Sequence, residues 1–178
     1  NPPVINNEAL NRNQSTPMAR NSRHKVVAGL LRTVLEPNLG LTGTGQEVSI
    51  MRSTLIRTGV IVNPGDDIRI NLHPAENPLM ANMLSEIETF IRAAREGGGQ
   101  QFSALYARLC SAENRIALRK ELVPLYLSAV LHEYKQQVAI HDPYGQVLLT
   151  ADTIMQINTI PEKYSLFYLD WNPKKQEF

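Results

Sequence analysis

The sequence predicts an α+β protein that is mostly helical and consists of two winged-helix-like units in tandem. Apolar residues recur at helical spacing over most of the chain, and two pairs of short β-rich runs surround turn sequences that contain Pro and Gly. The order helix, helix, hairpin, helix also occurs twice. With 178 residues, of which 43% are hydrophobic and 20% charged, the composition is that of a globular chain.

The chain begins with a segment that favours no regular structure. Residues 1–23 are rich in Asn, Pro and Ser, and we expect them to form a linker arm. Apolar residues at helical spacing predict a first helix over residues 24–35. Thr44 and Glu47 have the spacing of a capping box, which predicts that a second helix begins there and ends before Gly59.

A hairpin and a long helix complete the first unit, which we expect over residues 24–96. Residues 60–63 and 68–72 are short β-rich runs on either side of a Pro-Gly-Asp turn. Residues 75–96 have the apolar periodicity of a long amphipathic helix. This order of elements is that of a winged helix.

Three consecutive glycines, residues 97–99, predict a hinge between the two units. The second unit is expected over residues 100–178, and it repeats the order of the first. Apolar periodicity predicts one helix over residues 100–110 and a longer, more apolar one over residues 116–134. Pro124 would kink the interior of a helix, so the longer helix is expected to start close to it.

The rest of the second unit is predicted as a hairpin, a short helix and an aromatic segment. Residues 138–141 and 147–150 flank the turn sequence Asp-Pro-Tyr-Gly. A threonine-capped helix is expected over residues 152–157. Residues 164–171 are densely aromatic, and we expect them to pack as an edge strand or a clasp.

No set of residues in the chain has the pattern of an active site. The Gly-containing segment 41–47 lacks the Lys-Ser/Thr pair of a phosphate-binding loop. The four histidines are dispersed, and Cys110 is the only cysteine. We therefore expect no catalytic residues, no metal and no cofactor, so the chain is predicted not to be an enzyme. The lone cysteine favours the cytoplasm, and no apolar run predicts a membrane span.

Charge favours nucleic acid as a partner. Residues 1–62 contain seven Arg or Lys and three acids, although the formal net charge of the whole chain is only +1. The second helix of a winged helix enters the DNA groove with its outward side chains. The predicted contacts come from this helix and the segment before it: Arg23, Lys25, Gln46, Ser49, Arg52, Ser53 and Arg57. Asp66 and Asp67 in the hairpin turn would repel phosphate. A protein-interaction or oligomerisation module without nucleic-acid binding is the alternative.

Two stretches of the chain resemble a known family. They are residues 37–59 and residues 116–131, the second followed by the hairpin and short helix of the second unit. Both resemble blocks found in large P-loop NTPases of bacterial phage-defence and restriction systems, including the BREX ATPases. The positions that match the family pattern are Leu118, Arg119, Pro124, Leu127, Ala129 and Leu131. Ala117 and Glu121 stand where the pattern has glycines, and Ser128 stands where it has alanine.

The resemblance implies that the chain is a non-catalytic accessory region of such an NTPase. It would hold DNA or a partner subunit, while an ATPase domain elsewhere in the parent protein hydrolyses the nucleotide. Other domains or subunits of the assembly are then expected as partners.

Overall fold

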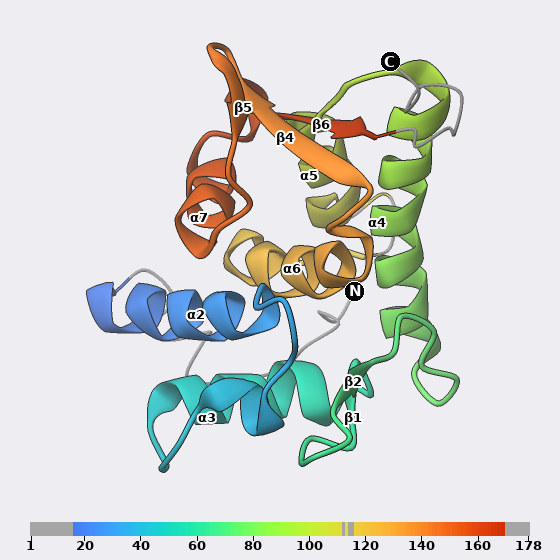
Figure 1. Cartoon of the computed structure of the whole chain (residues 1–178). Helices are drawn as coiled ribbons and strands as arrows, with labels where there is room; N and C mark the ends of the chain where they lie inside the picture. Colours follow the sequence, from blue (N-terminus) through green and yellow to red (C-terminus); the bar gives the residue numbers. More distant parts are fainter. Residues whose placement is uncertain (1–15, 112, 114–115, 170–178) are drawn as a thin grey trace, which may run out of the picture.

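The chain is an α+β fold, mostly helical, with small antiparallel sheets (Figure 1). The computed structural model describes residues 16–111, 113 and 116–169. Helices α2 and α3 lie one above the other at one end, α6 crosses the middle, and a four-stranded sheet lies at the other end (Figure 1). The long helix α4 runs along one side of these layers (Figure 1). No helix among the described residues is long and apolar enough to cross a bilayer.

The first helix begins earlier than the sequence predicted. Helix α2 covers Pro17–Leu30, so the expected linker arm is wrong from residue 17 onward, and the rest of the arm lies outside the described residues. The Thr16 side chain caps the helix by accepting a hydrogen bond from the Ala19 N–H at 3.1 Å. Proline in the first turn suits a helix start because its missing N–H would have no partner there.

The second helix is made of two segments. Helix α3 covers Gln46–Met51 and continues directly into a π-helical turn, η2, at Arg52–Ile56. The predicted capping box is wrong, since the N-cap is Gly45 and no side chain caps this helix. The predicted end is confirmed, because Gly59 has a φ of 85° that other residues adopt only with strain.

The connection from α2 to α3 makes a left-handed turn against α2. The 3₁₀ segment η1 covers Pro37–Gly40, and Asn38 and Leu39 have φ values of 52° and 57°. The buried Leu39 lies directly on Gly29 of α2, where a Cβ atom would come within 2.7 Å of the Leu39 carbonyl oxygen. The glycine therefore permits the close approach of the two segments.

A short hairpin and the long helix follow, as the sequence predicted. Strand β1 (Ile61–Val62) pairs antiparallel with β2 (Arg69–Ile70), and Ile61 lies opposite Ile70. Helix α4 covers Pro78–Gly97, and the Asn77 side chain caps it by accepting from the Met80 N–H at 3.2 Å.

The second half contains one helix that is buried on all sides. Strand β3 (Gln100–Gln101) leads into α5 (Phe102–Cys110). The 3₁₀ turn η4 (Lys120–Leu122) then leads into α6 (Val123–Tyr134), whose start at the proline is as predicted. Every residue of α6 from 123 to 131 is buried, so this helix is the centre of the core.

The four-stranded sheet has the order β3-β6-β4-β5 and is antiparallel throughout. The sequence predicted an edge strand or a clasp for this segment, but β6 lies between β3 and β4 and its backbone pairs on both sides. The predicted hairpin is confirmed as β4–β5, and the Thr150 side chain caps α7 as expected. The remaining bounds are β4 Val138–Asp142, β5 Gly145–Val147, α7 Ala151–Thr159, η5 Pro161–Lys163 and β6 Ser165–Tyr168.

One hydrophobic core joins the two halves of the chain. Buried residues from Val26 to Leu166 form a single cluster, and α4 packs against α5, α6 and β6 from the second half. Of the predicted hinge glycines, Gly98 has a φ of 86°, and a Cβ atom on Gly99 would meet the Phe167 ring at 2.5 Å. The division into two units stays a prediction of the sequence.

Candidate functional site

The exposed side of α3 and η2 carries four of the seven predicted nucleic-acid contacts. Ser49, Arg52 and Arg57 are exposed, and Ser53 is half-buried. In η2 the Arg57 N–H donates to the Arg52 carbonyl oxygen, five residues back, at 2.9 Å. Residues five apart differ by about 50° around the axis of a π-turn, against about 140° in an α-helix. The π-turn therefore brings the two arginines onto one side of the helix.

Two buried hydroxyl groups stabilise this π-turn. A π-turn shifts the hydrogen-bond register of the helix, so the carbonyl groups around it need other donors. The Thr54 carbonyl oxygen accepts from the Thr58 hydroxyl at 2.7 Å and from the Tyr126 hydroxyl of α6 at 2.9 Å. Burial raises the pKa of Tyr126 well above its ordinary value, which keeps its hydroxyl a donor. The core helix thus fixes the shape of the exposed turn.

Two further predicted contacts lie beside this side of the helix but are engaged with neighbours. The Lys25 ammonium lies 3.8 Å from the Glu47 carboxylate. The Gln46 side-chain oxygen accepts a hydrogen bond from the Ser22 hydroxyl at 3.2 Å. Both pairs connect α2 to the start of α3, so their first role is to hold the two helices together.

Arg23 does not lie on the surface, and its predicted contact with phosphate is wrong for this reason. The residue is 2% exposed, and its Nε and Nη1 atoms are buried without a hydrogen-bond partner. Burial lowers the pKa of Arg23, and the negative charge of Glu121 raises it by a smaller amount. The sequence suggested Arg23 for its charge and placed it in the linker arm, and local patterns could not show that α2 packs against α6 and α7.

The turn between β1 and β2 is acidic. Asp66 and Asp67 are exposed there, and Arg69 of β2 is exposed close by. The two carboxylates would repel a phosphate group, as the sequence predicted. A contact with nucleic acid on this face would therefore involve the helix and not the hairpin.

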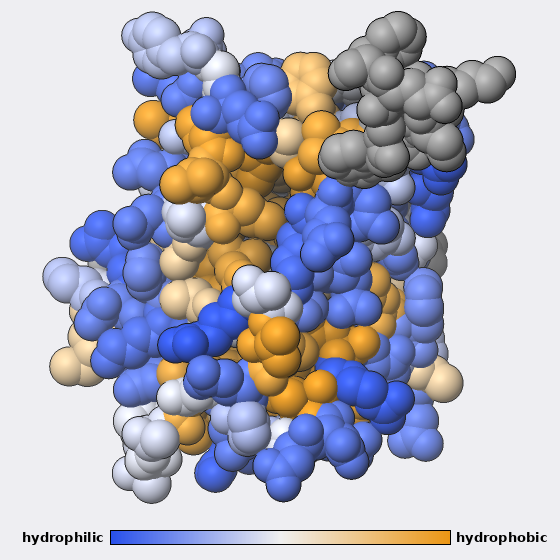
Figure 2. All heavy atoms as spheres, viewed as in Figure 1, coloured by the Kyte–Doolittle hydropathy of each residue, from blue (hydrophilic) through white to orange (hydrophobic). Residues whose placement is uncertain are grey.

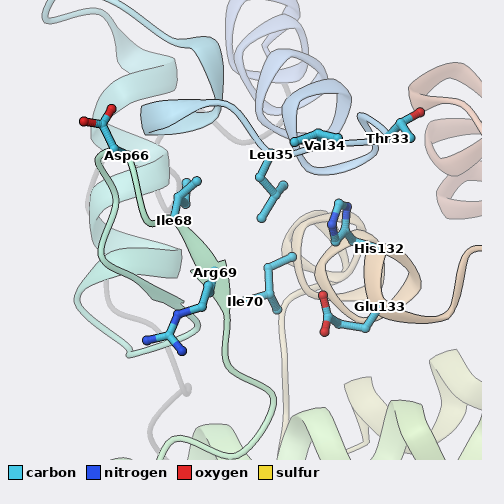
Figure 3. A pocket seen from close by; sticks show the side chains of 9 residues that line it. All are labelled: Thr33, Val34, Leu35, Asp66, Ile68, Arg69, Ile70, His132 and Glu133. Atoms are coloured by element: carbon cyan, nitrogen blue, oxygen red, sulfur yellow. The ribbon is translucent and has the colours of Figure 1, made fainter.

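A groove that the sequence did not predict lies between the hairpin, the end of α2 and the end of α6 (Figure 3). It encloses about 430 Å³. Leu35, Ile68 and Ile70 point toward its centre, whereas Asp66 and Arg69 point away from it (Figure 3). The other lining residues are Thr33, Val34, His132 and Glu133. No pattern in the sequence could reveal the groove, because its three walls are far apart in the chain.

His132, which lines this groove, and Lys135 bond to carbonyl groups at the end of α2 and just after it. The His132 Nδ1–H donates to the Leu30 carbonyl oxygen at 2.8 Å, and the Lys135 ammonium donates to the Thr33 carbonyl oxygen at 2.8 Å. Burial and the nearby Lys135 charge lower the pKa of His132. These contacts satisfy carbonyl groups at the end of a helix, which otherwise have no partner. The pair is thus a structural connection between α2 and α6.

Within the described part of the chain, no three His, Cys, Asp or Glu side chains are grouped so that they could hold a metal ion. Cys110 is exposed at the end of α5, and partial desolvation of its thiol raises the pKa of the group. Among the described residues, the basic side of α3–η2 and the groove beside the hairpin each offer a surface for binding.

Comparison with protein-family models, with curated proteins and with solved structures found no match to this chain.

Proposed function

We propose that this chain is a non-catalytic, winged-helix-like accessory region that contacts the sugar–phosphate backbone of nucleic acid through the exposed side of α3–η2. The observation that carries the proposal is the π-turn, which places Arg52 and Arg57 on one side of the helix. Ser49 is exposed one turn before Arg52, and hydroxyl groups commonly donate to phosphate oxygens, whereas the Ser53 hydroxyl donates to the Ser49 carbonyl oxygen at 2.9 Å.

The charges of the two arginines support this role. Neither Arg52 nor Arg57 forms an ion pair with any residue that the structure describes, whereas Arg32 and Lys25 lie near carboxylates. An exposed guanidinium without a carboxylate partner binds phosphate at no cost of breaking an internal pair. The order α2, α3–η2 and the β1–β2 hairpin is also the order in which a winged helix presents its second helix.

The parent protein in this proposal is a large phage-defence or restriction NTPase. The support is the resemblance of residues 37–59 and 116–131 to blocks of such proteins. The described residues contain no phosphate-binding loop, so the hydrolysis of nucleotide would belong to another part of that protein.

The first prediction is that replacing Arg52 and Arg57 together by Ala weakens binding to duplex DNA. Binding of a labelled duplex of about 20 base pairs is measured by fluorescence anisotropy between about 50 and 200 mM salt. The double variant should bind less tightly. Log affinity decreases with log salt, and this dependence should become less steep by about one unit for each phosphate group that the variant no longer neutralises.

The matched control replaces Arg92 and Lys163 by Ala, which removes the same charge from exposed positions on α4 and η5. This variant should bind as the unchanged chain does. Replacing Asp66 and Asp67 by Asn should tighten binding, because two charges that repel phosphate are removed. Equally weakened binding in the two double variants, or no binding by the unchanged chain at low salt, would exclude the proposed contact.

A further inference from the structure

Two titratable side chains at the end of α6 lie in contact beside the end of α2. The Lys135 ammonium is 3.3 Å from the Nδ1 atom and 3.3 Å from the Nε2 atom of the His132 ring. The Nδ1–H donates to the Leu30 carbonyl oxygen, so Nε2 is the nitrogen that carries no proton in the neutral ring. Protonation of His132 would therefore place a second positive charge beside the first.

The charged groups around this pair do not balance a second positive charge. Glu133, the next residue of α6, raises the pKa of His132, but burial and the Lys135 charge lower it by more. Burial lowers the pKa of Lys135 as well. From the hairpin, Asp66 and Arg69 line the same groove with opposite charges, and both point away from its centre (Figure 3). The site thus favours one positive charge over two.

The connection after α2, residues 31–36, is held in place by this pair. The Lys135 ammonium donates to the Thr33 carbonyl oxygen at 2.8 Å. In the described part of the chain, this is the one hydrogen bond that joins residues 32–35 to a different element. Without it, the partly buried Leu35 side chain would be left as the contact between these residues and the core.

The connection lies on the surface of the molecule. Val34 is 76% exposed, and Figure 2 shows apolar side chains at the surface in this region, among hydrophilic ones. The ion pair between Arg32 and Glu36, at 3.1 Å, lies within the connection and does not join it to a neighbouring element. Outward movement of the connection would therefore require no rearrangement of the core.

We propose that His132 and Lys135 form a pH-sensitive latch for the connection after α2. At neutral pH the uncharged ring allows the ammonium to lie against it and to bind the Thr33 carbonyl. At mildly acidic pH the Nε2 atom accepts a proton from solvent, and the imidazolium repels the ammonium, which leaves Thr33. Residues 32–35 then become mobile. The bond from His132 to Leu30 persists, because Nδ1–H donates in both protonation states, so α2 stays on α6.

The test follows the full chain by NMR from about pH 8 to about pH 5, the range in which histidine titrates. The Cε1–H signal of His132 reports the titration of its ring, and backbone order parameters report the motion of residues 32–35. The proposal expects order parameters of about 0.85 at the upper end that decrease toward about 0.6 or less as the ring is protonated. Unchanged order parameters, or a change with a different midpoint from that of the ring, would overturn it.

Two variants distinguish a latch from a contact that is only structural. Lys135→Met removes both the bond to Thr33 and the repelling charge. Residues 32–35 should then be mobile across the whole pH range, and the midpoint of the His132 titration should rise. His132→Gln leaves the ammonium beside a side chain that does not titrate, so residues 32–35 should stay ordered. An unchanged His132 midpoint in the first variant, or a mobile connection at low pH in the second, would contradict the proposal.

His24→Gln is the matched control, because it makes the same change at a histidine of α2 that lies 2.8 Å from Asp152. It should leave the pH-dependent motion of residues 32–35 as it is in the unchanged chain. A loss of this motion in His24→Gln equal to the loss in His132→Gln would overturn the assignment to the latch. A thermal melt checks that each variant is folded, and the titration of the unchanged chain decides the question if one of them is not.

Discussion

At the scale of single residues, Arg23 has the least favourable surroundings among the described side chains. It is buried on α2, and two of its nitrogen atoms have no hydrogen-bond partner. Glu121 lies near enough to raise the pKa of the guanidinium but makes no ion pair with it. A buried cation without partners costs several kcal/mol of desolvation, which the aliphatic part of its side chain only partly offsets.

We therefore predict that Arg23→Met stabilises the protein. Methionine keeps most of the buried volume and needs no hydrogen bonds, so the free energy of unfolding in urea should rise by about 1–3 kcal/mol. Arg20→Met is the control, because Arg20 is exposed on the same helix and its change should stay within about 0.5 kcal/mol. A clear decrease in the stability of Arg23→Met would show that the guanidinium has a partner.

His132 makes the stability depend on pH. Burial and the Lys135 charge hold its pKa below the ordinary value of 6.5, so the folded state binds fewer protons than the unfolded state at mildly acidic pH. The contribution of His132 to the free energy of unfolding is complete above its pKa in the unfolded state. It is lost as the pH falls toward its pKa in the folded state. The free energy of unfolding should therefore decrease between about pH 7 and pH 5.

His132→Gln should reduce this pH dependence. The glutamine amide can donate to the Leu30 carbonyl oxygen as the imidazole does, but it does not titrate. Urea unfolding of both proteins across the same pH range measures the difference in the pH dependence of their free energies of unfolding. The other histidines contribute equally to both proteins, so the difference reports on His132. Curves of equal slope would show that His132 is not responsible.

At the scale of elements, the exposed helix depends on the buried one. The Tyr126 hydroxyl of α6 and the Thr58 hydroxyl both donate to the Thr54 carbonyl oxygen. These two bonds provide partners for a carbonyl group within the π-turn. The position of Arg57 relative to Arg52 therefore depends on a side chain that is 72 residues away from Thr54 in the sequence.

We predict that Tyr126→Phe destabilises the fold and weakens the DNA contact. Removal of the buried hydroxyl leaves the Thr54 carbonyl with one donor and should lower the free energy of unfolding by about 1–2 kcal/mol. DNA affinity should fall because the π-turn is held less firmly. Tyr144→Phe is the control, since Tyr144 is 97% exposed and makes no comparable bond. Unchanged stability in Tyr126→Phe would show that this bond is dispensable.

At the scale of the whole molecule, the two halves of the chain share one core. Helix α4 buries Met83, Leu84, Ile87 and Ile91, and it packs against α5, α6 and β6 from the second half. Helix α2 likewise packs on α6 and α7. Each half by itself would expose these apolar faces to water.

We accordingly predict that residues 1–99 and 100–178, produced separately, do not fold alone but regain structure when mixed. Each fragment should unfold without a cooperative transition in circular dichroism, and the mixture should show one. A cooperative transition in either fragment by itself would instead support the division into two units that the sequence predicts.

The sequence by itself determined the type and order of most elements in the described chain. Local rules suffice for the hairpin at residues 60–72, the helix that starts beside Pro124 and the Thr150 cap, because periodicity, proline and capping residues act within a few positions. The same rules located the exposed side of α3–η2, since Ser49 and Arg52 alternate with buried residues along it.

Only the tertiary structure decided what each element packs against. It covered Arg23, placed β6 inside the sheet, turned the end of α3 into a π-helix under the Tyr126 hydroxyl, and formed the groove beside Ile70. All four outcomes depend on contacts between residues far apart in the chain. Local patterns carry no information about such contacts, because burial and register are set by the neighbour that an element meets and not by its own residues alone.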